Sequence, residues 1–318
     1  MSAAEAGWDA ARLEGALALA GSRATTALIL LLDGRILAER YYDVGDDYRR
    51  EVASCQKSVV SLLVGCALDR GLVALDEPVG TYAGRGWSNA SASEEDRITV
   101  RHLLSMTSGL DADFRPVAAP GEVWSYNNGV YHQVQPVLEA VTKTGIDELC
   151  TDWLWRPIGA TASRWYERIG NGDYAADTMG RPLWGLSMSA RDMARFGLLV
   201  QRGGTWGNEA VLADETYLDT ALASSSEANP SYGYLWWLNG QSGHRVGPSG
   251  SLQPGPLIPD APADTVAALG RDDQKIYISR ATGLVLVRQG ERGGTRSRET
   301  LSSFDTELWS AILDARPA

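Results

Sequence analysis

The chain has 318 residues, enough to bury a large hydrophobic core as one domain or as two interleaved ones. Its apolar fraction of 44% and charged fraction of 22% are those of an ordinary globular protein. The net charge of −11 argues against a nucleic-acid partner and against an anionic membrane surface, so we expect neither.

The N-terminal segment and the cysteines favour a reducing compartment. Residues 1–25 do not form a basic stretch followed by an apolar one, because Glu5, Asp9 and Glu14 interrupt them. The three cysteines cannot pair completely and have no metal-ligand spacing: Cys55, Cys66 and Cys150. We therefore expect a cytoplasmic protein, unless a signal peptide precedes the sequence given.

Both ends of the chain are predicted to supply strands. Near the N-terminus, Asp33-Gly34 separates two apolar runs, which is the strongest short-range pattern of a β-hairpin. Near the C-terminus, Lys275–Ser279 and Leu284–Arg288 flank a turn at Thr282-Gly283, and Leu301–Ala315 then has helical periodicity. We expect one antiparallel sheet, built from both chain ends and flanked by helices.

The middle of the chain is predicted to be mainly helical. Three stretches with a helical pattern alternate with Gly and Pro turns: Ser58–Arg70, Tyr131–Thr142 and Ala190–Gln201. This order indicates an α+β fold, an α/β sandwich with an inserted helical region. We expect residues 1–59 and 224–318 to form the sandwich and residues 60–223 the helical part, in one integrated unit.

A serine lies three residues before one of the chain's three lysines, at the start of the first of these helices. Residues three apart share a helix face, so Lys57 can bring its amine to the Ser54 hydroxyl. A serine hydroxyl is a weak nucleophile until a base takes its proton, and lysine is such a base only where its pKa falls from ~10.4. Arginine stays protonated in proteins and could not replace it. The Ser54 N–H, near a helix N-terminus, is also a candidate oxyanion donor.

Plainer interpretations of this stretch stay open. A Ser-x-x-Lys tetrad arises by chance about once in a chain of this size. Ser54 also fits the N-cap of the helix, and the scarcity of lysine fits a GC-rich genome. Cys55 is the weaker candidate nucleophile, because position i+1 points away from the face of Lys57 and no partner histidine is evident.

Three further stretches follow the tetrad in order: ITVRHLLSMTSGLD (Ile98–Asp111), PGEVWSYNNGVYHQV (Pro120–Val134) and GLSMSARDMARFGLLVQRGG (Gly185–Gly204). With the tetrad, they resemble the serine β-lactamase and penicillin-binding-protein superfamily, over residues from about 26 to 312. The chain is most similar to class C β-lactamases and their relatives. These relatives are the S-x-x-K carboxylesterases (family VIII type) and 6-aminohexanoate-dimer hydrolase.

The resemblance implies roles for several residues. Ser54 corresponds to the family nucleophile, Lys57 to its base and Tyr126 to the tyrosine that relays protons if nearby positive charge lowers its pKa. Asn128 would hydrogen-bond the lysine or the substrate carbonyl, although this segment also fits a polar turn that caps the next helix. We interpret His102 and its neighbours as support for the site.

The third family motif is expected on a strand near the C-terminus, beside the serine. We interpret the literal Lys143-Thr144-Gly145 as unrelated to it, because this stretch closes an amphipathic helix, with Gly145 as the C-cap. By resemblance to esterase and amide-hydrolase branches, Ala268-Leu269-Gly270 takes the place of the motif. Gln274 fits that branch pattern, whereas Asp273 replaces its second glycine.

The same resemblance makes the N–H of Arg271 the second oxyanion donor, beside Gly270. The Lys or His that binds a β-lactam carboxylate in many relatives is absent from this strand. Arg271 and His244 are candidates to replace it, but we favour the interpretation of Arg271 as an ordinary surface arginine. We therefore do not expect efficient β-lactam hydrolysis.

Two features concern the substrate. The stretch Gly247–Val266 contains five prolines and no clear period, so it is predicted to be a long ordered loop, either a lid or wall of the site or a plain surface excursion. Most of the eleven tryptophans are expected in the core. We expect Trp124, Trp184 and Trp237 to line an apolar acyl pocket suited to a small ester or amide.

We therefore expect a serine hydrolase that needs no cofactor and no metal and takes a small-molecule ester or amide. A carboxylesterase is favoured, and a linear-amide hydrolase of the aminohexanoate type, an acyltransferase and a weak β-lactamase are the alternatives. A Ser-His-Asp α/β-hydrolase would need a G-x-S-x-G elbow, which the chain lacks. The three scattered histidines disfavour a zinc enzyme. A non-catalytic ligand-binding protein on the same fold stays open, although it should have lost the serine, lysine or tyrosine.

Overall fold

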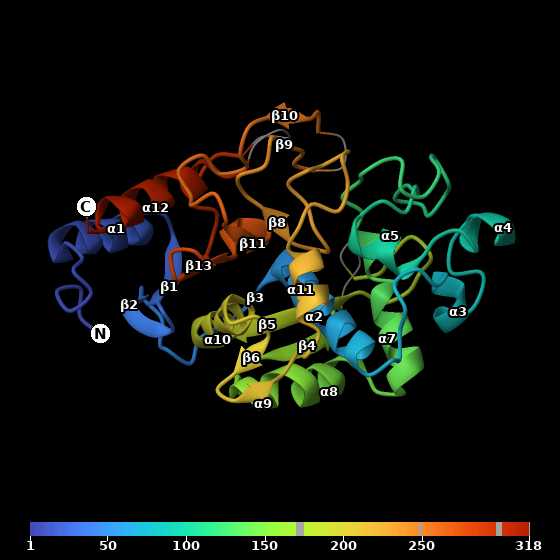
Figure 1. Cartoon of the computed structure of the whole chain (residues 1–318), viewed down its shortest axis with the longest axis horizontal. Coiled ribbons are helices and arrows are strands. Elements are labelled where there is room, and N and C mark those ends of the chain that lie inside the picture. The colour runs from blue at the N-terminus through green and yellow to red at the C-terminus, as the bar shows by residue number, and fades with distance from the viewer. Residues whose placement is uncertain (170–174, 248–249, 297–300, 318) are drawn as a thin grey trace.

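The computed structural model describes residues 1–169, 175–247, 250–296 and 301–317 (Figure 1). Its helices are α1 (Ala10–Ser22), α2 (Gln56–Asp69), α3 (Val79–Ala83), α4 (Ala92–Glu95), α5 (Val100–Leu104), α6 (Asn128–Tyr131), α7 (Val134–Thr142), α8 (Ile146–Cys150), α9 (Arg156–Ile158), α10 (Ala190–Gln201), α11 (Glu215–Ala221) and α12 (Ser303–Asp314). Shorter helical turns are η1 (Ala53–Cys55), η2 (Thr151–Trp155) and η3 (Arg271–Asp273).

The strands of the described residues form one large sheet and three small ones. They are β1 (Thr25–Leu32), β2 (Arg35–Tyr41), β3 (Arg49–Glu51), β4 (Arg164–Glu167), β5 (Trp184–Ser189), β6 (Thr205–Trp206), β7 (Glu209–Ala210), β8 (Trp237–Leu238), β9 (Gly243–His244), β10 (Gln253–Pro254), β11 (Val266–Leu269), β12 (Lys275–Ser279) and β13 (Leu284–Gly290). The large sheet has the order β2-β1-β13-β12-β11-β8, and every neighbouring pair is antiparallel.

Both predicted hairpins are confirmed, and together they join the two chain ends in the large sheet. In the first, Asp33 and Gly34 have φ angles of 51° and 80°, the left-handed conformation that a tight hairpin turn needs at both positions. In the second, β12 pairs with β13, which in turn pairs with β1. The predicted antiparallel sheet from both ends of the chain is therefore correct, and so is the α+β fold class.

Helices cover the two faces of this sheet. Successive side chains of a strand point to opposite faces. On β12, Tyr277 packs edge-on against Trp309 of α12, whereas Ile276 lies on the side of α10. Gly197 of α10 allows this close approach, since a Cβ there would lie 2.6 Å from a methyl of Val285. The helix α1 packs beside α12, as Figure 1 shows in blue and red.

The three predicted helices of the middle region are present as α2, α7 and α10, with small shifts at their ends. One detail was wrong. Gly145 does not cap the end of α7: Lys143 occupies the C-cap with a left-handed φ of 59°, and Gly145 instead precedes α8 with an ordinary φ. The predicted division at residues 60–223 stays a prediction, and α10 within it packs on the large sheet.

Two features place the site within this fold. The sheet β3-β5-β4 brings the end of β3 to the turn η1, and η1 leads directly into α2. Ends of β11 and β12 approach the same turn from the large sheet. Among the described helices, none is both long and apolar enough to cross a membrane.

Candidate active site

The turn that carries Ser54 is fixed on several sides. Ala53 has a left-handed φ of 48°, a conformation that costs a non-glycine residue about 1 kcal/mol or more. The N–H of Val52 donates to the carbonyl of Leu186 in β5 at 2.9 Å. The thiol of Cys55 donates to the carbonyls of Ala268 and Gln274, both at 3.3 Å, which ties the turn to the large sheet.

Two alternative interpretations of this turn, Cys55 as the nucleophile and Ser54 as a helix N-cap, are not supported. Burial raises the pKa of Cys55 to about 12, so its thiol stays protonated and is held between two carbonyls. Cys55, and not Ser54, occupies the N-cap position of α2, and no side chain in the described residues caps that helix. The Ser54 hydroxyl is therefore not used as a helix cap.

Lys57 lies next to the Ser54 hydroxyl and is almost completely buried, with an exposed fraction of 3%. Its Nζ is 3.0 Å from the Ser54 Oγ and 2.8 Å from the Asn128 Oδ1, and both of these partners are neutral. Burial, followed by the positive charge of Arg168, lowers the pKa of Lys57 to about 7. A large fraction of the amine is therefore free near neutral pH and can accept the proton of Ser54.

Tyr126 lies in the loop before α6 and faces Ser54 and Lys57. Its ring stacks on Trp237 with centroids 5.7 Å apart, and its centroid lies 4.8 Å from the Lys57 Nζ. Burial raises the pKa of Tyr126 to about 12, although a hydrogen bond with Ser54 opposes this shift. The lowered pKa on which its expected proton relay depends is thus not found, and Tyr126 is a neutral phenol that can donate a proton.

The neighbouring asparagines divide two tasks. The side chain of Asn127 accepts from the N–H of Val130 at 3.1 Å and caps α6, as the polar-turn interpretation predicted. The Asn127 amide also donates to the carbonyls of Leu110 and Asp111, which joins it to the HLLSMTSGLD stretch. This leaves Asn128 to hold the lysine. His102 closes a capping box with Thr99, a structural role.

Gly270 follows β11 and lies against the nucleophile turn. A Cβ there would be 2.3 Å from the carbonyl oxygen of Val52 and 3.3 Å from the Cys55 Sγ. Its φ of −117° is ordinary, so the glycine is needed for space and not for conformation. The chain at Gly270 therefore passes beside the turn that carries Ser54, and Gly270 and Arg271 line the same cavity as Ser54.

A cavity of about 310 Å³ opens over these residues. Seven of the nine predicted site residues line it: Ser54, Lys57, Tyr126, Asn128, Trp237, Gly270 and Arg271. The other two are not among the described lining residues. Trp124 packs against Tyr126 and Tyr232, and the carbonyl of Trp184 accepts from Gln56.

The cavity has both apolar and polar walls, and Trp237 is the one predicted tryptophan among its described lining residues. Polar and charged side chains that the sequence analysis did not assign to the site also line the cavity: Glu51, Gln56, His132, Arg168, Asp273, Lys275, Arg296 and Ser302. Gln56 lies between the two catalytic candidates in sequence, which was a usable hint. Arg168 is more than a hundred residues away, and no local pattern marks it.

Of His244 and the described part of the proline-rich stretch, only Gly247 lines the cavity. The His244 Nδ1 is 3.1 Å from the carbonyl oxygen of Gly255, and His244 is not among the described lining residues. Gly247 lines the cavity, whereas Gln253–Pro254 forms the strand β10 against β9. Residues 248–249 of the predicted loop lie outside the described residues.

Comparison with known proteins agrees with this architecture. A solved structure of a candidate β-lactamase from Bacteroides dorei has a TM-score of 0.74 at 18% identity and covers 97% of this chain and 99% of its own. A candidate 6-aminohexanoate-dimer hydrolase from Bacillus anthracis has a TM-score of 0.68 at 19% identity (94% and 80% covered). EstCE1, described as a hydrolase with promiscuous acyltransferase activity, has a TM-score of 0.68 at 14% identity (95% and 98% covered).

These likenesses show a fold of the serine β-lactamase and penicillin-binding-protein superfamily. The family model described as Beta-lactamase matches residues 10–297, which is most of the chain. The protein therefore belongs to the β-lactamase family, and the superfamily resemblance expected from the sequence is confirmed.

Proposed function

We propose that this protein is a serine hydrolase that cleaves a small ester through an acyl-enzyme on Ser54. The observation that carries this proposal is the 3.0 Å contact between the Lys57 Nζ and the Ser54 Oγ, in which the lysine has neutral partners. A buried amine in such surroundings favours its free-base form, which is what a serine nucleophile requires. The description of two structural neighbours as hydrolases supports the same class.

In the proposed acylation step, the free amine of Lys57 takes the proton of Ser54 while Oγ attacks the substrate carbonyl carbon. The N–H groups of Ser54 and Arg271 stabilise the resulting oxyanion. When the tetrahedral intermediate collapses, the phenol of Tyr126 donates its proton to the leaving alkoxide, and the Lys57 ammonium returns a proton to Tyr126. The alcohol leaves, and Ser54 carries the acyl group.

Deacylation runs through the same groups in the reverse roles. Water gives a proton to Lys57 through Tyr126 as it attacks the acyl carbon, and the same two N–H groups hold the oxyanion. Collapse of this intermediate returns the proton to the Ser54 Oγ and releases the carboxylic acid. An alcohol or amine in the place of water would give acyl transfer.

The cavity volume of about 310 Å³ lies at the small end of ligand pockets, which favours a short acyl group. A linear amide with charged ends is the second candidate. Charged side chains of both signs line the cavity, among them Arg271 and Asp273, and such groups would suit a zwitterionic chain.

The three free, buried cysteines support our prediction of a cytoplasmic location.

The proposal is tested by steady-state turnover of p-nitrophenyl butyrate and of the matching p-nitroanilide. We expect the wild-type protein to release p-nitrophenolate and Ser54→Ala to lose this activity. Faster turnover of the anilide than of the ester would favour the amide candidate. Ester hydrolysis that survives in Ser54→Ala would contradict the proposed nucleophile.

A further inference from the structure

Arg168 reaches the wall of the active-site cavity from the end of β4, and it is held there tightly. Its side chain has an exposed fraction of 17%. The Nη2 and Nε atoms donate to one carboxylate oxygen of Glu51, at 2.5 and 3.1 Å. The phenol of Tyr166 donates to the other oxygen at 2.7 Å. Glu51 is thus fixed by two partners, and the guanidinium has little freedom to move.

A second contact directs Arg168 toward the base. Its Nη2 donates to the Gln56 Oε1 at 3.4 Å, and the Gln56 Nε2 donates to the Tyr131 hydroxyl at 3.1 Å. The centroid of the Tyr131 ring lies 4.5 Å from the Lys57 Nζ. A continuous series of contacts therefore joins Arg168 to Lys57 through two buried side chains.

The neighbouring strand β5 leaves room for this arrangement. A Cβ at Gly185 would lie 2.7 Å from the ring of Tyr166 and 3.1 Å from the Arg168 Nε. A side chain at this position would displace one or both of them. The backbone of β5 is thus shaped to let the Arg168 and Tyr166 side chains pass.

The other titratable groups that face Lys57 on this side are held neutral. Burial raises the pKa of Tyr126, Tyr131 and Cys55, so all three stay protonated. Burial and nearby positive charge lower the pKa of His132 well below its usual value, so its imidazole is uncharged at neutral pH. Among the described residues, Arg168 and Glu51 are therefore the charged pair on this wall.

Charged groups of the opposite wall must be considered too. Arg271, Asp273 and Lys275 line the cavity from the β11–β12 side, and Arg296 lines it further along the chain. Lys275 and Asp273 form an ion pair of their own at 3.2 Å. Arg168 is the charged group that the contacts through Gln56 and Tyr131 join to Lys57.

We propose that Arg168 is a positioning residue for the proposed reaction, whose fixed guanidinium disfavours a second positive charge on Lys57 and so keeps the base as a free amine. Glu51 sets the strength of this effect, because its carboxylate offsets part of the guanidinium charge while it holds the group in place. The inference depends on the proposed role of Lys57, but its test does not depend on turnover.

The chain's three lysines make a direct test practical. Protein labelled with ¹³C at the lysine Cε gives one NMR signal per lysine, and the signal of Lys57 is the one lost in Lys57→Arg. We expect its titration midpoint in the wild type to lie near 7. In Arg168→Gln the midpoint should rise by about one pH unit, since a nearby like charge has been removed. In Glu51→Gln it should fall, because the guanidinium charge is then no longer offset.

Arg50→Gln is the matched control. The Arg50 side chain has a similar exposed fraction, 18%, and also pairs with a glutamate, Glu291, at 2.6 Å. It should leave the Lys57 midpoint unchanged. An unchanged midpoint in Arg168→Gln, or an equal rise in Arg50→Gln, would overturn the proposal. If Arg168→Gln fails to fold, Glu51→Gln decides: a lower midpoint supports the proposal, and an unchanged or higher one overturns it.

The acid limb of the kcat/KM profile should move with the NMR midpoint in each variant. If NMR shows the expected shifts but Ser54 forms no acyl-enzyme, the proposed function fails and the inference about Arg168 stands. If turnover is normal but the midpoints do not move, the proposed function stands and the inference about Arg168 fails. The two ideas are therefore tested separately.

Discussion

The molecule contains two buried lysines with the same exposed fraction, 3%, and opposite surroundings. The Lys57 Nζ contacts a hydroxyl and a carboxamide oxygen, on Ser54 and Asn128. The Lys275 Nζ contacts carboxylates: Asp305 at 2.8 and 3.0 Å and Asp273 at 3.2 Å. Burial disfavours the charged amine at both sites, and carboxylates compensate for it at only one of them. The partners, and not the depth, decide which lysine can act as a base.

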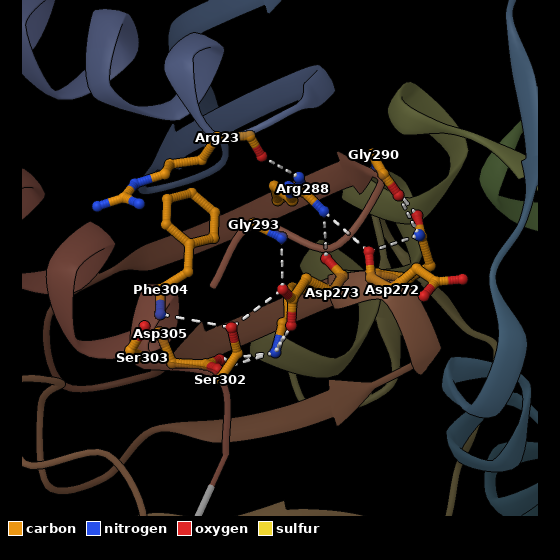
Figure 2. Close-up of polar contacts among 12 residues, drawn as sticks. Arg23, Asp272, Asp273, Arg288, Gly290, Gly293, Ser302, Ser303, Phe304 and Asp305 are labelled. Carbon is orange, nitrogen blue, oxygen red and sulfur yellow. Dashed lines mark hydrogen bonds and ion pairs between the residues drawn. The ribbon is translucent and has the colours of Figure 1, made fainter. Parts of the chain in front are cut away.

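The surroundings of Lys275 form a structural network, part of which Figure 2 shows. Asp273 accepts from the N–H of Gly293 at 2.8 Å and from the hydroxyl of Ser302 at 3.0 Å (Figure 2). Burial alone would raise the pKa of Asp273, but Lys275 and these donors lower it below its usual value. The phenol of Tyr277 donates to Asp305. The network joins η3, β12 and the start of α12, so we expect it to stabilise the fold.

The largest expected effect is on activity, at Lys57. In Lys57→Arg the base would stay protonated, so kcat/KM for p-nitrophenyl butyrate should fall at least about 10⁴-fold. Lys143→Arg, at an exposed position, should keep wild-type activity and serves as the control. Activity within tenfold of the wild type in Lys57→Arg would remove Lys57 from the mechanism.

The next effect is on stability and separates the two lysines. Lys275→Met leaves two buried carboxylates without their cation, so the free energy of unfolding should fall by about 3–5 kcal/mol. Lys57→Met removes an amine whose charged form burial disfavours, so the free energy of unfolding should not fall and should rise instead. Urea unfolding at pH 7 measures both. Equal losses in the two variants would contradict the comparison.

The active site and the network around Lys275 can also be compared by removing one hydroxyl group from each, at Tyr126 and at Tyr277. Tyr126→Phe keeps the ring stacked on Trp237 but removes the proton donor, so kcat should fall about 10²–10³-fold while stability is nearly unchanged. Tyr277→Phe leaves Asp305 with one donor fewer and should cost about 1–3 kcal/mol of unfolding free energy without a loss of kcat. Kinetics and urea unfolding of both variants check this; a reversed pattern would mean that the roles are exchanged.

The smallest effect is a dependence of stability on pH. The pKa of Lys57 is near 7 in the folded protein, against 10.5 for a lysine side chain exposed to water, so the unfolded chain binds more protons between these values. The free energy of unfolding should therefore rise with pH from 7, by about 1–2 kcal/mol by pH 8.5. Lys57→Met should lack this rise. A wild-type slope equal to that of the variant would show that the folded pKa of Lys57 is not lowered.

Local sequence patterns were sufficient for the parts of the molecule that local chemistry determines. The turn at Asp33-Gly34 follows from the left-handed conformation that these residues tolerate. The approach of Lys57 to Ser54 follows from the spacing of three residues, and the superfamily motifs placed Tyr126 and Asn128 in the same region. The resemblance also identified Gly270. The structure explains why a glycine is needed there, because the carbonyl of Val52 leaves no room for a Cβ.

Long-range packing accounts for what the sequence did not show. Glu51 and Arg168 meet across 117 positions, and neither is marked by a motif. Trp184 was expected in the cavity from its place near a motif, but it is not among the described lining residues, and its carbonyl accepts from Gln56. In the same way, the pairing of Gln253–Pro254 with β9 depends on a fold that no short-range pattern in a proline-rich stretch predicts.

The central claim is that Ser54 carries the acyl group, and intact mass after rapid quenching tests it most directly. Wild-type protein mixed with p-nitrophenyl butyrate and quenched in acid should gain the mass of one butyryl group, about 70 Da, and peptide mapping should place it on Ser54. Ser54→Ala should gain none. A butyryl group on another residue of the wild type, or turnover without any adduct on Ser54 under conditions that trap the intermediate, would contradict the account.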